Sequence, residues 1–286
     1  MISILDFPVP THMPAQLPIN INDALFASLS YLGFQRFFPH PDLSPWVQCY
    51  WVAQQPLLSK PTPSETVYPD GGTTLIFDFV ANDYPDTIFN ATHNTSQMQF
   101  PGQINRMGIR FHPGGAFQLL GVDMQDVDEG DSAAENLAPK SLAQLRAQLA
   151  ELSPINQRLK LIDQWLLTLA DKANNGLIQR LLPPLMLAQE SIDTLSAQLP
   201  ISRRQLERKF QQEVGFSAIQ LKQLHRIKLA RALISRQPEL PLSHVGQDAG
   251  FYDQAHFIRH FQKITGLTPN QYRQKKMSQK YNPTPD

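Results

Sequence analysis

The sequence predicts two parts, an α+β N-terminal region and an all-α C-terminal region built around a repeated helical unit. Three observations support this division: short aromatic and β-branched runs up to about residue 111, helical periodicity after residue 115, and a stretch near the C-terminus that is written twice. A length of 286 residues corresponds to about two domains, and 42% apolar residues suffice for ordinary cores.

Short apolar runs predict the strands of the N-terminal region. Pro, Gly and Asn separate these runs, and Asp70-Gly71 is a turn signal directly before one of them. Their enrichment in aromatic and β-branched residues is typical of strands. The four runs are Trp46–Val52, Thr74–Val80, Thr87–Phe89 and Met107–Phe111.

Three helices are predicted to follow the strands, at Ala116–Leu120, Leu142–Leu152 and Leu159–Leu169. The last is expected to begin with Ser153 as its N-cap and Pro154 at its first position. Its apolar stripe would either complete the core of its own domain or pair with the same helix of a second copy, and the core role is favoured.

The duplicated stretch runs from Ser202 to Ser217 and recurs, fifty-one residues later, from Asp253 to Thr268. Each copy opens with an N-cap residue and stops at a Gly that suits a left-handed cap. The copies therefore predict two short amphipathic helices. The positions in register include Arg208/Arg259, Phe210/Phe261, Gln211/Gln262 and Gly215/Gly266.

A second short helix precedes each copy. Leu195–Leu199 leads through Pro200-Ile201 into the first copy, and Val245–Ala249 leads through Gly250–Tyr252 into the second. This order is the helix-turn-helix layout, whose second helix enters the DNA major groove. A connector from Ser217 to about Ile234 would span roughly 27 Å, close to the roughly 34 Å between successive major grooves on one face of DNA. One chain could then place two helices in adjacent grooves of slightly bent DNA.

The charges are distributed unevenly although they sum to zero. Residues 190–286 carry 15 Lys and Arg against 8 Asp and Glu, whereas residues 1–189 carry 10 against 17. The basic part is the one with the duplicated helices. Binding to phosphates by counterion release requires such a local excess, so double-stranded DNA is the expected partner.

From about residue 186 to residue 274, the chain resembles the AraC/XylS family of bacterial transcription regulators. The resemblance rests on Gly250–Phe261, on Gly266–Arg273 and on the connector segment Arg226–Ile234. It implies a sequence-specific DNA-binding regulator that is not an enzyme, with a small-molecule effector, a second copy of the chain and RNA polymerase as further partners.

The candidate DNA contacts lie on the two duplicated helices. Arg can pair with guanine, Glu can accept from cytosine and Gln can recognise adenine, while Lys suits phosphates. Glu207 could instead pair with Arg203 or Arg204 within its helix, and Arg208 could form a structural ion pair or contact phosphate. The candidates are Ser202, Arg203, Arg204, Glu207, Arg208, Gln254, His256, Arg259 and Lys263.

In the N-terminal half, Tyr68–Gly72 and Gly108–Gly115 resemble a less characterised class of domains attached to AraC-type DNA-binding regions. In that family, this position usually holds a cupin-like domain that binds an effector and dimerises. Aromatic strand residues are the candidate pocket lining, although simple core packing explains them more readily. The turn from His112 to Gly115 could offer N–H groups to an anion, but a tight strand-to-helix turn is favoured. The candidates are Trp51, Tyr68, Phe77, Phe79, Phe111 and His112.

The sequence holds no pattern for a cofactor or a metal. The spacings of His12, His40, His93 and His112 lack a cupin-type metal motif, and His256 and His260 have no third ligand nearby. The lone Cys49 lies in an apolar run and is expected to be a buried thiol. Two rivals stay open: an N-terminal enzyme tethered to DNA, and a constitutive DNA-binding protein whose N-terminal half only dimerises.

The expected division is a flexible leader (1–19), a sensor and dimerisation domain (20–175), a linker (176–185), a DNA-binding domain (186–276) and a tail (277–286). Asn174-Asn175-Gly176 and Pro183-Pro184 predict the linker. The chain has no run of eighteen apolar residues and no basic-then-apolar N-terminus, which predicts a cytoplasmic protein.

Overall fold

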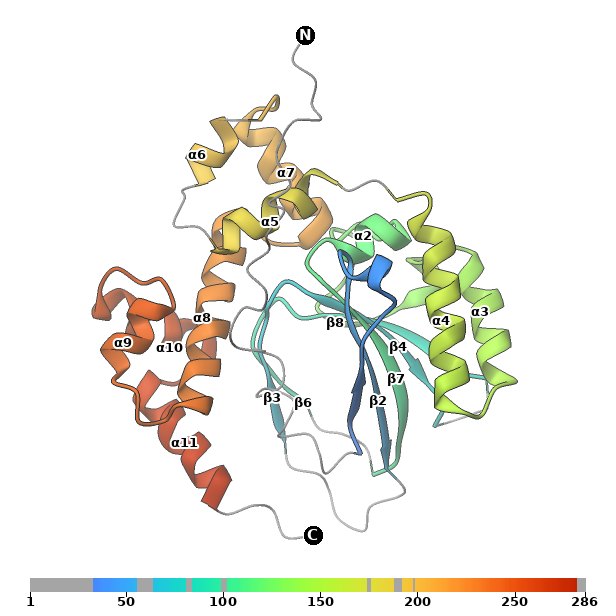
Figure 1. Ribbon diagram of the computed structural model, residues 1–286, viewed down its shortest axis with the longest axis horizontal. Helices are drawn as coiled ribbons and strands as arrows, with labels where there is room; N and C mark the ends of the chain where they lie inside the picture. Colours follow the sequence, from blue (N-terminus) through green and yellow to red (C-terminus); the bar gives the residue numbers. More distant parts are fainter. Residues whose placement is uncertain are drawn as a thin grey trace.

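The computed structural model describes residues 33–55, 64–80, 84–98, 102–173, 176–187, 192–197 and 199–281. A sheet with helices beside it forms the N-terminal half, and a chain of helices forms the C-terminal half (Figure 1). Helix α8 (Ala218–Arg236) runs between the two groups of C-terminal helices. The expected leader and Asn174-Asn175 lie outside the described residues.

The N-terminal half contains a six-stranded antiparallel sheet in the order β1-β2-β7-β4-β5-β8 and a separate two-stranded sheet in which β3 pairs with β6. All four predicted strands are present, although β4 ends two residues earlier than expected and β5 is longer at both ends. The short polar strands β6 and β8 carry no apolar alternation, so the sequence pattern did not reveal them. The strands are β1 (Gln35–Phe37), β2 (Val47–Gln55), β3 (Glu65–Val67), β4 (Thr73–Asp78), β5 (Asp86–Ala91), β6 (Ser96–Met98), β7 (Ile104–Phe111) and β8 (Gly130–Ala133).

The two faces of the large sheet differ, because neighbouring residues of a strand point to opposite sides. One face, with Leu75, Phe77 and Ile109, packs against helices α3 (Ser141–Ala150) and α4 (Ile155–Ala170). The buried apolar residues of this face and of the two helices form the first core. On the other face, Trp51 of β2 lies opposite Gly108 of β7. A Cβ on Gly108 would come within 2.3 Å of the Trp51 ring, so this position requires glycine.

Helix α4 differs slightly from the prediction. Its N-cap is Pro154 rather than Ser153, and Pro154 has extended backbone angles with no side-chain cap bond. The φ of Pro154, −69°, would suit a helix, but its ψ of 129° is extended, so the helix starts one residue later than expected. The apolar stripe of α4 is buried in the first core through Ile162, Trp165 and Leu166, as the core interpretation predicts.

Seven helices are described in the C-terminal half. Helices α6 and α9 begin three residues earlier than expected, while α8 has 19 residues and spans roughly 28 Å. The expected tail (277–286) is helical in its first residues, because α11 extends to Tyr281. The helices are α5 (Leu177–Leu187), α6 (Ile192–Ala197), α7 (Arg203–Val214), α8, α9 (Leu242–Asp248), α10 (Gln254–Thr265) and α11 (Pro269–Tyr281).

The expected linker is a helix in the structure. Residues 177–187 form α5 with Pro183 and Pro184 inside it. Proline costs a helix interior about 3 kcal/mol, but here α5 buries Ile178 and Leu185 against Phe210 of α7. Burial of several such side chains offsets the proline cost, at about 1.5–3 kcal/mol for each. Helix α5 therefore packs as part of the C-terminal half.

Candidate nucleic-acid interface and interdomain cavity

The two duplicated helices, α7 and α10, are built alike. Each has 12 residues, and each ends at a glycine with positive φ: Gly215 at 78° and Gly266 at 73°. Helix α7 begins with a capping box, in which Ser202 Oγ accepts from the Gln205 N–H and Gln205 Oε1 accepts from the Ser202 N–H. Helix α10 begins with Asp253, whose carboxylate accepts from the backbone N–H of residue 256 at 2.7 Å. The predicted boundaries of both helices are confirmed.

Below these caps, matching apolar residues anchor the two helices. Leu206 and Phe210 of α7 are buried in a second core, which α5, α6, α7 and the start of α8 share. Phe257 and Phe261 of α10 are buried in a third core, which the rest of α8 shares with α9, α10 and α11. In the second unit, α9 approaches α10 closely at Gly246, where a Cβ would lie 3.0 Å from the Phe257 ring. This is the close crossing that a helix-turn-helix unit needs.

On α7, the residues opposite the core are largely charged. Arg204 and Arg208 are exposed and Glu207 is half-buried. Arg203, although exposed, forms an ion pair with Asp193 of α6. The described ion-pair partner of Arg203 is therefore on α6 of the same unit and is not Glu207. The candidates whose side chains lie toward solvent on this helix are Arg204 and Arg208, with Glu207 beside them.

On α10, Gln254 and Arg259 are exposed. His256 instead lies within an aromatic group, with its ring 4.2 Å from that of His260 and 5.6 Å from that of Phe251. Lys263 lines a cavity between the two halves of the molecule. Gln254 and Arg259 are thus the candidates of this helix that face away from both the core and the N-terminal half.

The N-terminal half contacts the last turn of α7. Gln212 donates to Asp123 Oδ2 at 2.8 Å, and its carbonyl accepts from the Met124 N–H at 2.8 Å. The next residue, Glu213, accepts from Gln118 Nε2 at 2.9 Å. Burial raises the pKa of the Glu213 carboxyl above its ordinary value, although the Gln118 hydrogen bond and Lys209 act in the opposite sense.

The last turn of α10 is contacted at equivalent positions. Fifty-one residues after Gln212 and Glu213 come Lys263 and Ile264. The Ile264 carbonyl accepts a hydrogen bond from Thr95 of the N-terminal half, and Lys263 borders the cavity. The same turn of both duplicated helices therefore meets the N-terminal half.

A third contact joins the Tyr68–Gly72 turn to α8. Asp70 lies 2.9 Å from Lys228 Nζ and also pairs with Arg110 of β7, while its Oδ1 accepts from the Gly72 N–H. Burial alone would raise the pKa of Asp70, but Arg110, Lys228 and the Gly72 N–H together hold it well below the ordinary value. Asp70 is therefore a carboxylate that links a strand of the sheet to the connector helix.

The same turn makes a cation–π contact, in which the guanidinium of Arg231 on α8 lies 3.6 Å from the centre of the Tyr68 ring. Two histidines lie near the Asp70 cluster. Burial, with Lys228 adding to it, lowers the pKa of His112 and of His225 to about 4. Both imidazoles are consequently neutral at pH 7.

The six effector candidates do not line one cavity of the described structure. Phe77, Phe79 and Phe111 are part of the first core, as the packing alternative predicts. Trp51 lies on the opposite face of the sheet and stacks on Phe34 with ring centres 5.8 Å apart.

His112 precedes a tight turn into α2 (Gly115–Leu120), where Gly114 has a φ of 75°. A Cβ on Gly115 would lie 2.3 Å from the Trp46 carbonyl oxygen. This geometry is the strand-to-helix turn that the sequence favoured. Of the six candidates, Tyr68 is the one that lines the interdomain cavity.

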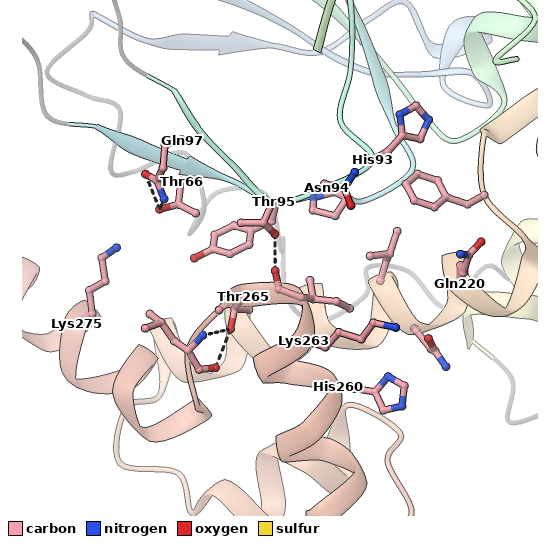
Figure 2. Close-up of a pocket in the computed structure, with 18 residues that line it drawn as sticks. Thr66, His93, Asn94, Thr95, Gln97, Gln220, His260, Lys263, Thr265 and Lys275 are labelled. Atoms are coloured by element: carbon pink, nitrogen blue, oxygen red, sulfur yellow. Dashed lines mark hydrogen bonds between the residues drawn. The ribbon is translucent and has the colours of Figure 1, made fainter. Parts of the chain in front are cut away.

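That cavity has a volume of about 750 Å³ and lies between the two-stranded β3–β6 sheet and the C-terminal helices (Figure 2). Its lysines, Lys263 and Lys275, come from the helical side, and both sides contribute amide and hydroxyl groups. No sequence pattern indicated it, because its walls come from segments far apart in the chain. The polar residues at its rim include Thr66, Asn94, Thr95, Gln97, Gln220, Gln223, His260, Lys263 and Lys275.

Three further features of the described residues concern a reactive thiol, a metal site and a membrane-spanning helix. Cys49 is buried, and burial raises the pKa of its thiol, as expected for a structural cysteine. Within the described ranges, no group of three His, Cys, Asp or Glu residues could hold a metal ion. No helix in this part of the chain is long and apolar enough to cross a membrane.

Comparison with known families matches two segments of the chain. Residues 195–275 match a helix-turn-helix domain family, and residues 35–131 match a domain of unknown function, DUF6597. The first segment spans α7 to α10. The second holds the strands β1 to β7 and the Tyr68–Gly72 turn.

Among characterised proteins, the chain is similar to the arabinose operon regulatory proteins of Salmonella typhimurium and Escherichia coli. Each is 33% identical over 82 residues, which is 29% of this chain. Those residues make up 29% and 28% of the two regulators, so the chain spans less than a third of the length of these relatives. The C-terminal region is therefore an AraC-type helix-turn-helix domain.

Solved structures of ToxT from Vibrio cholerae resemble most of the chain weakly. Two of them are 12% identical, with TM-scores of 0.36 and 0.37. The superpositions cover 84% of this chain and 96% and 97% of those chains. Scores this low do not establish a shared binding site.

Proposed function

We propose that this chain, whose C-terminal region is an AraC-type helix-turn-helix domain, is a sequence-specific DNA-binding transcription regulator. One observation carries the proposal: a single connector, α8, holds two helix-turn-helix units whose second helices have the same length, the same cap positions and the same buried anchors. Such a pair suits two successive major grooves on one face of DNA.

The proposed base contacts are the exposed residues opposite the two cores. Arg204 and Arg208 of α7 suit guanine, and Gln254 of α10 suits adenine. Arg259 is suited to a base or a phosphate. The docking of the N-terminal half leaves Arg204, Arg208, Gln254 and Arg259 exposed, so the intact chain can present both helices to DNA.

The N-terminal half is proposed to bind a small effector and to alter DNA affinity. Its contacts with α7, α8 and α10 support this role, since any change in those contacts would change how the two helices are held. A coupling free energy of about 1–3 kcal/mol between the effector site and the DNA-binding helices would be typical. A second copy of the chain and RNA polymerase are further proposed partners.

Binding of the full chain to a pool of random duplex DNA, followed by selection, tests the proposal. Affinity should fall steeply with salt, because phosphate contacts release counterions. Arg204→Ala should cost about 1–3 kcal/mol on the selected site and relax the base preference in one half of it. Lys160→Ala, at an exposed position on α4, is the matched control and should change neither. A folded chain that selects no sequence would rule out specific DNA recognition.

A further inference from the structure

The interdomain cavity draws its walls from both halves of the molecule. Thr66 and Gln97 on the paired strands β3 and β6 form one side, together with Asn94 before β6. Residues of α8, α10 and α11 form the other side, and Figure 2 shows Lys263 and Lys275 among them. A molecule bound there would touch the N-terminal half and the DNA-binding half at once.

The charges of the lining have one sign. Lys263 and Lys275 supply ammonium groups, and none of the described lining residues is an Asp or a Glu. The Gln223 amide can donate hydrogen bonds to an oxyanion, whereas the Thr66 hydroxyl already donates to Gln97 and the Asn94 amide already donates to Glu129. The lining thus offers a donor and two ammonium groups to a ligand, and Glu129, which is not a lining residue, is bound by His93 and Asn94.

The cavity also has an apolar part. Phe216 and Leu224 are buried residues that line it, and Leu267 lies beside them, half-buried. A volume of about 750 Å³ falls within the range of about 300–1,000 Å³ that small-molecule sites usually have. The combination of apolar wall, hydrogen-bond donors and ammonium groups suits a ligand that has both an apolar body and an anionic group.

We propose that this cavity is the effector site and that it binds a small organic anion with an apolar part. The inference rests on the proposed function for its effect on DNA, but not for the binding itself. It moves the effector site from the aromatic strand residues to the junction of the two halves. A ligand held there by Lys263 of α10 and by the two-stranded β3–β6 sheet would strengthen the weaker of the two contacts between the N-terminal half and the duplicated helices.

Two fluorescent probes with the same aromatic skeleton test the binding. Anilinonaphthalene sulfonate carries an anionic group, and N-phenylnaphthylamine lacks it. Full-length protein should bind both. The double variant Lys263→Gln/Lys275→Gln should bind the sulfonate at least tenfold more weakly and the uncharged probe equally well. Lys160→Gln, at an exposed position on α4, is the charge-matched control and should bind both probes like the original chain.

A second variant tests whether the probes bind in the cavity itself, because it fills the cavity without changing its charge. Gln223→Trp places an indole in the cavity from α8 and should weaken the binding of both probes. Circular dichroism and thermal melting check that each variant is folded. Binding of the sulfonate to the double lysine variant with unchanged affinity would overturn the proposal, as would full binding of both probes by folded Gln223→Trp.

The link to DNA is measured separately. Saturating sulfonate should change the DNA affinity of the full chain by about fivefold or more, the lower end of typical coupling, and DNA should change sulfonate affinity by the same factor. Sulfonate binding that has no effect on a chain that still binds DNA would refute the effector role. A chain that binds the sulfonate but no DNA would refute the regulator function and leave the anion site standing.

Discussion

The two helix-turn-helix units have the same internal construction but are held differently by the rest of the molecule. The last turn of α7 makes three hydrogen bonds to the N-terminal half, through Gln212 and Glu213. The equivalent turn of α10 has one described hydrogen bond, from Thr95, and a cavity beside it. The comparison teaches that a duplicated unit can keep its fold while its copies make different contacts with the N-terminal half: three hydrogen bonds for the first copy and one described hydrogen bond for the second.

The helices that pack against the two units from outside also differ. Helix α5 packs in the same core as α7, so the first unit is supported by a helix that precedes it in the chain. The second unit packs instead with α11, whose Tyr272 is buried beside Phe261. The exposed residues of the two helices differ too. Helix α7 presents arginines to solvent, whereas α10 presents mainly Gln254 and Arg259.

Removal of one buried phenylalanine from each unit should have the largest effect. Phe210→Ala and Phe261→Ala each empty a fully buried site and should lower the free energy of unfolding by about 3–5 kcal/mol. Hydrogen exchange should show faster opening of α5 to α7 in the first variant and of α9 to α11 in the second. Opening of all the C-terminal helices by either change would mean that the units are not separate.

The Asp70 contact is shared by both units, so its loss should affect them equally. Asp70→Asn leaves Arg110 and Lys228 without a counter-charge and should cost about 3 kcal/mol or more, as the loss of one partner from a buried ion pair usually does. Exchange should rise along α8 rather than in one unit.

Two controls belong with that variant. Asp70→Asn/Lys228→Met removes a cation together with the carboxylate and should recover part of the lost stability. Asp78→Asn breaks the ion pair with Arg106, which lies within the sheet half, and should leave exchange along α8 unchanged. If Asp78→Asn loosened α8 as much as Asp70→Asn does, the Asp70 contact would have no special role in docking.

Acid should loosen the same shared contact. The pKa values of His112 and His225 are lowered to about 4, so the folded protein binds fewer protons than the unfolded chain, whose imidazoles titrate near 6.5. The stability that the neutral imidazoles contribute is present above pH 6.5 and is lost as the pH falls through about 4. The loss should reach on the order of 1–3 kcal/mol for each imidazole. Denaturant titrations between pH 7 and 4 measure it: His225→Gln should flatten the slope, and the exposed His244→Gln should not.

Much of the C-terminal half could be predicted because its determinants are local. Ser202, Asp253 and the two terminal glycines are caps that act within four residues. Because the caps recur at equivalent positions fifty-one residues apart, the prediction of each helix supports the prediction of the other. Helix α5 was missed for the opposite reason. Pro183 and Pro184 indicate a break locally, while the burial of α5 depends on Phe210, which lies outside any local window.

The site could be predicted only in part. The exposed arginines of α7 follow from amphipathic spacing, but the contact of Asp70 with Lys228 joins residues 158 positions apart. The cavity walls likewise come from the two-stranded β3–β6 sheet and from α8, α10 and α11. The aromatic residues proposed for the pocket were chosen by type, and residue type alone does not distinguish a core residue such as Phe77 from a cavity residue such as Tyr68.

The smallest expected effect concerns Glu213, whose equivalent in the second unit is the apolar Ile264. Burial raises the pKa of Glu213, so the folded protein holds this proton more tightly than the unfolded chain does. The group therefore favours the fold at low pH, and its contribution declines as the pH rises above the ordinary value of 4.5. Glu213→Gln keeps an acceptor for the Gln118 amide and removes the charge.

The variant should thus be slightly more stable than the original chain at pH 7, by under about 1 kcal/mol, and should depend less on pH between 4.5 and 7. Urea denaturation at several pH values measures both effects. Ile264→Val, the matched change in the second unit, should leave the pH dependence as it is. Should Glu213→Gln instead lose the same stability at every pH, the carboxylate would be a needed partner of Gln118 and Lys209, and the first unit would depend on that charge for its attachment to the N-terminal half.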